Sequence, residues 1–141
     1  MRALTPRLTL RHVASIPPEV YVDAQIVLTS ALAGDTDRVV GTFDSVMARL
    51  GMAGAYDLAW CLAATMVGAD APTGAWTLDF PGIDDAQYDA RWVARFVSAY
   101  ANSDASTATA LFGAAIEDGQ LPECLLSLVT SAVATLRRRA A

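Results

Sequence analysis

The 141-residue chain is 54% hydrophobic and 18% charged, with a formal net charge of −5. This composition excludes a disordered chain, which needs low hydrophobicity and high net charge, and the length suits one domain with a substantial core. The acidic balance argues against nucleic-acid binding, because neutralising phosphates takes a basic face. Only the end segments, residues 1–18 and 124–141, carry arginine without any acid. These basic ends are expected either to lie on the acidic body or to reach an anionic partner.

A short turn joins the first two predicted helices. The first runs from Pro18 to Ala33, since proline is favoured at the start of a helix and Gly34 favours its end. Asp35 is a typical N-cap for the second helix, whose apolar residues recur at helical spacing. Gly51 is expected to stop this second helix.

The third and fourth predicted helices flank the centre of the chain. The third covers residues 55–67 and ends where glycine and proline interrupt its pattern. The fourth begins within the sequence IDDAQY, where Asp84 is expected to cap the helix. Gln87, as the third helical residue, would then bond back to the cap.

The last two predicted helices fill the C-terminal part. The fifth begins near Ser103 or Asp104 and ends at Gly119. The sixth begins at Pro122 and ends with arginines at residues 137–139, whose positive charge suits the C-terminal end of a helix. The chain is therefore predicted to be all-α, with six helices.

The two halves of the chain share one order of elements. An extended leader precedes three predicted helices in each half, and the leaders LTLRHV (8–13) and WTLDF (76–80) alternate apolar and polar residues as strands do. A shift of 69 residues aligns Asp35 with Asp104 and Phe43 with Phe112. The halves are therefore expected to be copies of one unit.

The predicted architecture combines these observations. We expect a single domain over residues 1–141, a six-helix bundle built from two similar halves, residues 8–68 and 76–139. The leaders are expected to pair as a small β-ribbon, which needs helix packing for stability. The apolar helix faces of one half should be covered by those of the other.

Residue patterns typical of catalysis are missing from the sequence. His12 is the only histidine and has no cysteine or carboxylate at ligand spacing, and no phosphate-binding loop, nucleophile elbow or HExxH motif occurs. Cys61 and Cys124 lie in apolar surroundings and are predicted to be buried thiols in a reducing compartment. We expect no metal, no cofactor and no enzymatic activity.

The acidic hexapeptide DDAQYD is similar to the aspartate-rich magnesium motif of terpene synthases. The resemblance rests on Asp84, Asp85 and Asp89, and it implies metal-dependent phosphate chemistry. Those enzymes are much longer, and their second metal motif is missing from this chain. Capping by Asp84 is therefore the favoured interpretation, and magnesium binding is a further hypothesis.

The first candidate binding site is an apolar strip. Trp76, Leu78 and Phe80 lie on one side of the extended segment between the halves. With Leu8 and Leu10 of the first leader, they form a surface that either covers the seam between the halves or docks a protein partner.

The second candidate site is a pocket between the helical halves. Trp60, Met66, Trp92 and Phe96 are its expected lining, and an apolar small molecule is its expected ligand. The same aromatic residues are also typical of a packed core.

The favoured function is a non-enzymatic interaction, adaptor or assembly protein of the cytoplasm. Its partner is expected to be a protein of unknown identity or a second copy of the chain. No membrane binding is expected, because the longest uncharged apolar runs, residues 58–69 and 124–136, are shorter than the ~20 residues of a membrane span.

Overall fold

The computed structural model describes residues 16–68 and 87–140, and in these two ranges the chain is all-α. The helices are α2 (Pro18–Leu32), α3 (Thr36–Val67), α4 (Tyr88–Ala101), α5 (Ala105–Glu117) and α6 (Leu121–Ala140). The predicted fold class is confirmed. The two leaders lie outside the described ranges, and within those ranges no strand of a β-ribbon is seen.

Helix α3 changes direction at Gly51. This residue has φ 71° and ψ −161°, a conformation that is essentially restricted to glycine. It divides α3 into a first arm, residues 36–50, and a second arm, residues 52–67. The predicted second and third helices are these two arms. The described chain therefore has five helices where six were expected, because it passes from one arm to the other without a loop.

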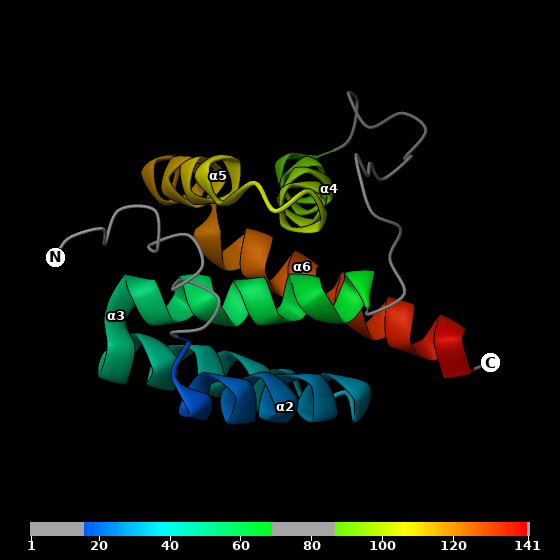
Figure 1. The fold of residues 1–141 in the computed structure, drawn as a ribbon. Coiled ribbons are helices and arrows are strands. Elements are labelled where there is room, and N and C mark those ends of the chain that lie inside the picture. Colours follow the sequence, from blue (N-terminus) through cyan, green and yellow to red (C-terminus); the bar gives the residue numbers. More distant parts are fainter. Residues whose placement is uncertain (1–15, 69–86, 141) are drawn as a thin grey trace, which may run out of the picture.

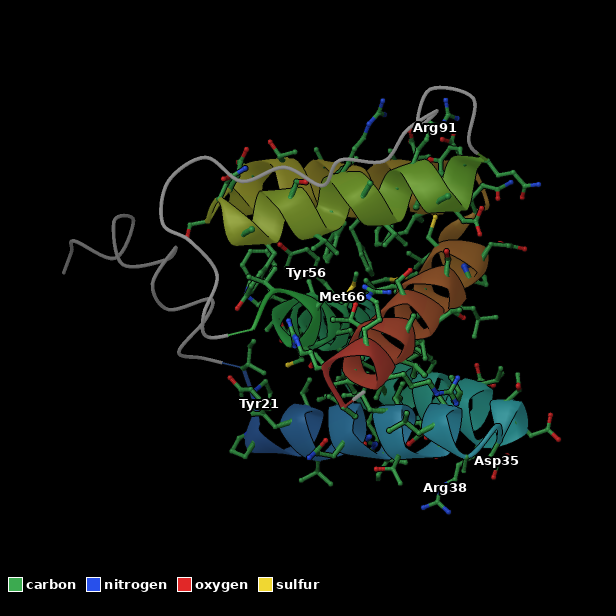
Figure 2. The ribbon with its side chains drawn as sticks, turned by 90° about the vertical axis from the view of Figure 1, so that its right-hand side faces the viewer. Tyr21, Asp35, Arg38, Tyr56, Met66 and Arg91 are labelled. Atoms are coloured by element: carbon green, nitrogen blue, oxygen red, sulfur yellow. The ribbon has the colours of Figure 1, made fainter. Side chains whose placement is uncertain are left out.

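The helices lie in three layers. Figure 1 shows α2 and the first arm of α3 in the lower layer, α4 and α5 in the upper layer, and the second arm of α3 with α6 between them. Figure 2 shows the same layers after a 90° turn, with Arg91 on the upper layer, Tyr56 in the middle and Arg38 on the lower one. The middle layer thus takes one helical segment from each half of the chain.

The turns before α3 and α5 are built alike. Asp35 Oδ1 accepts a hydrogen bond from the Arg38 N–H, and Asp104 Oδ1 accepts one from the Thr107 N–H, both at 3.1 Å. Each aspartate N–H also donates at 2.8 Å to the carbonyl five residues earlier. The residue before each aspartate has a positive φ, 77° at position 34 and 57° at Ser103. The predicted N-cap at Asp35 is confirmed, and of the two residues at which the fifth helix was expected to begin, Asp104 is the cap.

The start of α4 corrects the sequence prediction. Gln87 has an extended backbone, with φ −66° and ψ 161°, and stands just before the first helical residue, Tyr88. Its carbonyl accepts the first helical hydrogen bond, from the Arg91 N–H at 3.1 Å. Gln87 is therefore not the third helical residue that a cap at Asp84 requires. Asp84 itself lies outside the described residues.

One hydrophobic cluster joins the three layers, with members from all five helices. Its largest fully buried side chains include Phe96 of the upper layer, Leu58 and Leu128 of the middle layer, and Val27 of the lower layer. Small side chains in the middle layer, such as the fully buried Ala132, let the helices approach closely. The apolar faces of the two halves therefore cover each other, as expected.

The arginines at the end of α6 lie on the body of the protein. Arg139 donates to the carbonyls of Thr65 and Met66, at 2.7 and 2.6 Å, and Arg137 donates to the Leu32 carbonyl at 3.2 Å. Carbonyls in the last turn of a helix lack partners within it and carry partial negative charge. The end of α6 therefore ties down the last turns of α2 and α3, both from the first half.

Helix α3 is the one helix of the described ranges that is long and apolar enough to cross a membrane, with a hydropathy of 1.3 in its most apolar window. The same property is typical of core helices in soluble proteins, and 44% of this window is buried. Membrane insertion has only this weak support, and a cytoplasmic location stays a prediction.

Gly51→Ala should lower the free energy of unfolding by about 1–3 kcal/mol, because a Cβ disfavours this backbone conformation. Steric crowding is not the reason, since beyond the adjacent helical backbone nothing lies within 4 Å of an added Cβ. Urea denaturation measures the change.

Gly41→Ala is the matched control for the Gly51 variant. Gly41 lies in the same helix, is equally uncrowded and has no positive φ. Alanine there should stabilise the helix by about 0.5–1 kcal/mol. Equal effects of the two variants would contradict the special role of Gly51.

Candidate functional site

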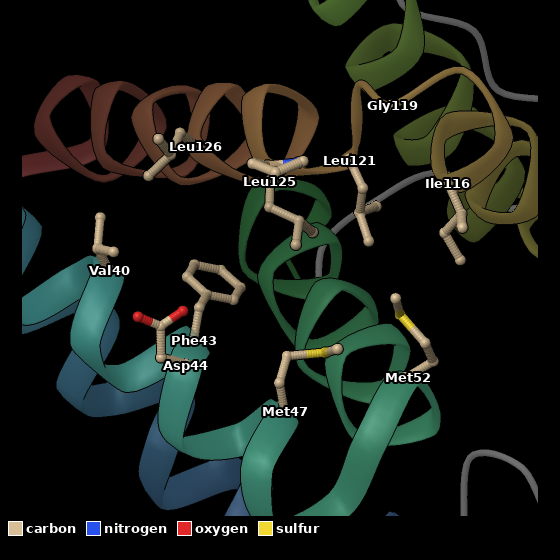
Figure 3. A pocket seen from close by; sticks show the side chains of 11 residues that line it. Val40, Phe43, Asp44, Met47, Met52, Ile116, Gly119, Leu121, Leu125 and Leu126 are labelled. Carbon is tan, nitrogen blue, oxygen red and sulfur yellow. The ribbon is translucent and has the colours of Figure 1, made fainter.

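The strongest candidate site is an apolar groove of about 460 Å³, which we call the seam groove (Figure 3). It lies where the first half of the chain, through α3, meets the second half, through α5 and α6. Its lining residues are Val40, Phe43, Asp44, Met47, Met52, Ile116, Gly119, Leu121, Pro122, Leu125 and Leu126.

Helical spacing builds the two walls of the seam groove. Phe43 and Asp44 each lie three or four residues from both Val40 and Met47, so the four residues line one side of the first arm of α3. The first turns of α6 present a second apolar face opposite them, as Figure 3 shows. Met52 follows the kink at Gly51, so the break in α3 places a side chain at the end of the groove.

Large hydrophobic side chains are concentrated at the surface of the seam groove. The exposed fractions are 39% for Val40, 43% for Met52, 39% for Ile116 and 37% for Leu126. Phe43, Leu121 and Leu125 form its buried floor. Exposed apolar surface costs free energy, about 25 cal/mol per Å², and contiguous apolar surface is typical of binding sites.

Among the residues that the structure describes, Asp44 is the only charged one that lines the seam groove. Its side chain is exposed, and among the described residues its carboxylate takes part in no side-chain hydrogen bond or ion pair. The segments that build the groove, residues 36–52 and 116–126, together carry five carboxylates and two arginines. The electrostatic environment of the groove is therefore negative.

A hydrogen bond holds the end of α5 beside the groove. Tyr88 Oη donates to Asp118 Oδ2 at 2.6 Å. The carboxylate stabilises the protonated phenol and thereby raises the pKa of Tyr88 to about 12. Gly119, with φ 68°, follows directly and lines the groove. The Tyr88 contact thus helps to set the direction in which the chain enters α6.

Trp60, Met66, Trp92 and Phe96 do not line the seam groove. Trp92 stacks on Phe96 with ring centroids 4.6 Å apart, and Trp60 meets Phe96 edge-on at 6.4 Å. Trp92 Nε1 also donates to the Leu111 carbonyl at 2.8 Å. The three aromatic residues are buried and pack against one another, and Met66 is half-buried. A ligand-binding role for these four residues stays a prediction.

The residues of the predicted docking strip lie outside the described ranges. These are Leu8, Leu10, Trp76, Leu78 and Phe80. Their role in docking therefore stays a prediction.

The magnesium hypothesis has no test among the described residues. His12, Asp84 and Asp85 lie outside these ranges, and Asp89 lies in the first turn of α4. No group of three or more His, Cys, Asp or Glu side chains in residues 16–68 and 87–140 is placed to hold a metal ion.

Sequence reasoning missed the seam groove, although it assigned several of its residues to apolar helix faces. Phe43 and Met47 belong to the apolar pattern of the second predicted helix, and Phe43 is indeed buried. The periodicity of a helix shows which face is apolar. It does not show how far another helix covers that face, so the exposure of Val40 and Leu126 had no signal in the sequence.

Both cysteines are free and buried, as predicted, with Cys61 in the second arm of α3 and Cys124 in α6. Burial disfavours the charged thiolate and raises the pKa of Cys61 to about 11 and that of Cys124 to about 12. Nearby carboxylates, Asp57 for Cys61 and Asp89 for Cys124, raise these pKa values further. The thiols are therefore protonated at neutral pH and are poor nucleophiles.

The free energy of unfolding should fall as the pH rises above about 9. The folded protein binds the two thiol protons more tightly than the unfolded chain, whose thiol pKa is near 9.0, so unfolding releases protons between pH 9.0 and about 12. Urea denaturation at about pH 8 and pH 10 measures the decline. Cys124→Ala should make the decline shallower, and an unchanged decline would contradict this assignment.

The groove's chemistry suits non-covalent binding. In the described ranges its lining offers apolar walls and one carboxylate, and includes no nucleophile beside a base. No protein-family model, curated protein or solved structure matches the chain.

Proposed function

We propose that the protein is a non-enzymatic interaction module, and that the seam groove is where a partner protein docks a helix. The observation that carries the proposal is the gathering of Val40, Met52, Ile116 and Leu126, all more than a third exposed, around a buried apolar floor. Burying such side chains against a partner is favourable because their apolar area leaves water.

The walls of the seam groove favour a helix as the docked element. Two helical surfaces with an apolar floor between them match the groove in which an amphipathic helix buries residues spaced by three and four. The alternative of adding a strand to a sheet edge needs a sheet, and residues 16–68 and 87–140 contain no strand.

A small apolar ligand is a second candidate for the groove. Its volume of about 460 Å³ falls within the range of roughly 300–1,000 Å³ that is typical of ligand pockets. The groove also lies between the two halves, where the sequence analysis placed such a ligand, although other residues line it.

An internal duplication is our proposal for how the seam arose. The matching turns at Asp35 and Asp104 support it, as does the position of the last helical segment of each half in the middle layer. The 69-residue shift also relates Met47 to Ile116, and both line the groove. Superposition of residues 19–67 on 88–136, at the 69-residue shift, tests the duplication, and agreement no better than between unrelated helical bundles would contradict it.

Leu126→Asp should abolish capture of the partner while leaving the fold intact, because Leu126 is exposed and lies at the groove. Leu32→Asp is the matched control, since Leu32 is 42% exposed at the end of α2 and does not line the groove. The wild type and the two variants are each used to capture proteins from an extract of the source organism. Mass spectrometry then identifies and compares the captured proteins.

The expected result is at least one protein that wild type and Leu32→Asp retain and Leu126→Asp loses. Retention of the same set of proteins by Leu126→Asp would contradict docking at the seam groove. Circular dichroism and urea denaturation of both variants separate lost binding from lost folding.

Thermal-shift screening tests the second candidate function. An apolar ligand present at 100 times its Kd should stabilise the fold by about 2.7 kcal/mol, and the melting temperature should rise accordingly. The rise should disappear in Leu126→Asp and persist in Leu32→Asp. If no neutral apolar compound in the screen raises the melting temperature of the wild type or of Leu32→Asp, the small-ligand candidate is dismissed.

A further inference from the structure

The charges around the seam groove bear on the chemistry of its partner. We propose that the groove selects a basic amphipathic helix, in which a lysine or arginine pairs with Asp44. This inference rests on the proposed function, and it specifies that the docked helix is positively charged.

Carboxylates dominate the segments that build the groove. The five acidic residues are Asp37, Asp44, Glu117, Asp118 and Glu123, and all are exposed. The two arginines of these segments are directed to α2: Arg38 lines a different pocket formed with α2, and Arg49 pairs with α2 carboxylates. A partner that approaches the groove therefore meets negative potential.

The arginines that pair with other groups do not neutralise these carboxylates, because their contacts lie elsewhere. Arg49 pairs with Asp23 at 2.9 Å and with Glu19 at 3.2 Å, both on α2. Arg137 and Arg139 bind the carbonyls at the ends of α2 and α3. In the part of the chain that the structure describes, no arginine lines the groove.

Asp44 gives the groove a charge preference. It lies between Val40 and Met47 on one helix face, so a docked helix that covers these two side chains also removes water from the carboxylate. Desolvating a carboxylate is unfavourable unless a donor or a cation replaces the water. A lysine or arginine beside the apolar stripe of the partner meets this need, whereas a glutamate there adds repulsion.

Charge also argues against a second copy of the chain as the occupant. A symmetric dimer through the seam groove would place two sets of the same five carboxylates in one interface. Like charges brought together at an interface disfavour the complex. The partner is therefore a different protein, and its docking helix carries the opposite charge.

Selection from a displayed peptide library tests the proposal. The library fixes leucine at helical spacing on one face and varies the other positions equally among lysine, glutamate and glutamine. Peptides are selected on the wild-type protein, and those that also bind Leu126→Asp are removed. The enriched peptides should have a net positive charge and should bind at least ten times more tightly than their glutamate counterparts.

Fluorescence anisotropy with an enriched peptide locates the charge pair. Asp44→Asn should weaken binding by about two- to fivefold, the range for an exposed ion pair, and added salt should reduce the difference. Asp89→Asn is the matched control, because it removes the same charge from the first turn of α4, outside the groove lining, and should leave the affinity unchanged.

Each contrary result has a distinct meaning. Enrichment of neutral or acidic helices that depend on Leu126 would overturn the charge preference and leave helix docking intact. The absence of any Leu126-dependent peptide would overturn the proposed function as well. Light scattering that shows a wild-type dimer and a Leu126→Asp monomer would assign the groove to a second copy and overturn this proposal.

Discussion

At Gly51 the chain leaves the helical conformation for a single residue, with φ 71° and ψ −161°, and then resumes it. This turn lets one helix supply the first arm to the lower layer and the second arm to the middle layer (Figure 1). The second arm can then pack beside α6, and each of the outer layers covers one side of this central pair. The backbone freedom of a residue without a Cβ therefore determines the order of the layers.

The same change of direction produces the seam groove. The first arm and the first turns of α6 face each other across the groove, with Met52 and Ile116 at its end (Figure 3). The aromatic and aliphatic core is complete elsewhere, with Phe96 and Leu58 fully buried. The exposed apolar surface of the described residues is thus gathered largely at the place where the two halves meet, and its position and negative surroundings support the binding function that we propose.

The sequence predicted the helices well where a local signal marks their ends. Asp35 and Asp104 are short polar residues that cap the next helix through their own side chains, so three or four residues contain the whole signal. The prediction at Asp84 used the same signal and was wrong about Gln87, because the extended backbone of Gln87 places the helix start after it. Gly51 was recognised as a break, but a glycine in the sequence does not show whether a loop follows.

The candidate site was harder to predict, because it depends on which surfaces remain uncovered. Trp60, Trp92 and Phe96 were candidates for a pocket because of their size, yet large rings that contact one another fill space. Val40 and Leu126 are ordinary members of apolar helix faces, and only tertiary packing leaves them exposed.

The central claim is that the side chains of the seam groove are open to water in the folded protein. Methyl NMR with a soluble paramagnetic agent tests it most directly, and the methyls of Met52, Ile116 and Leu126 should relax far faster than those of Leu58, Leu62 and Leu128. Equal protection of both sets would show that the groove is closed in solution and would contradict the account.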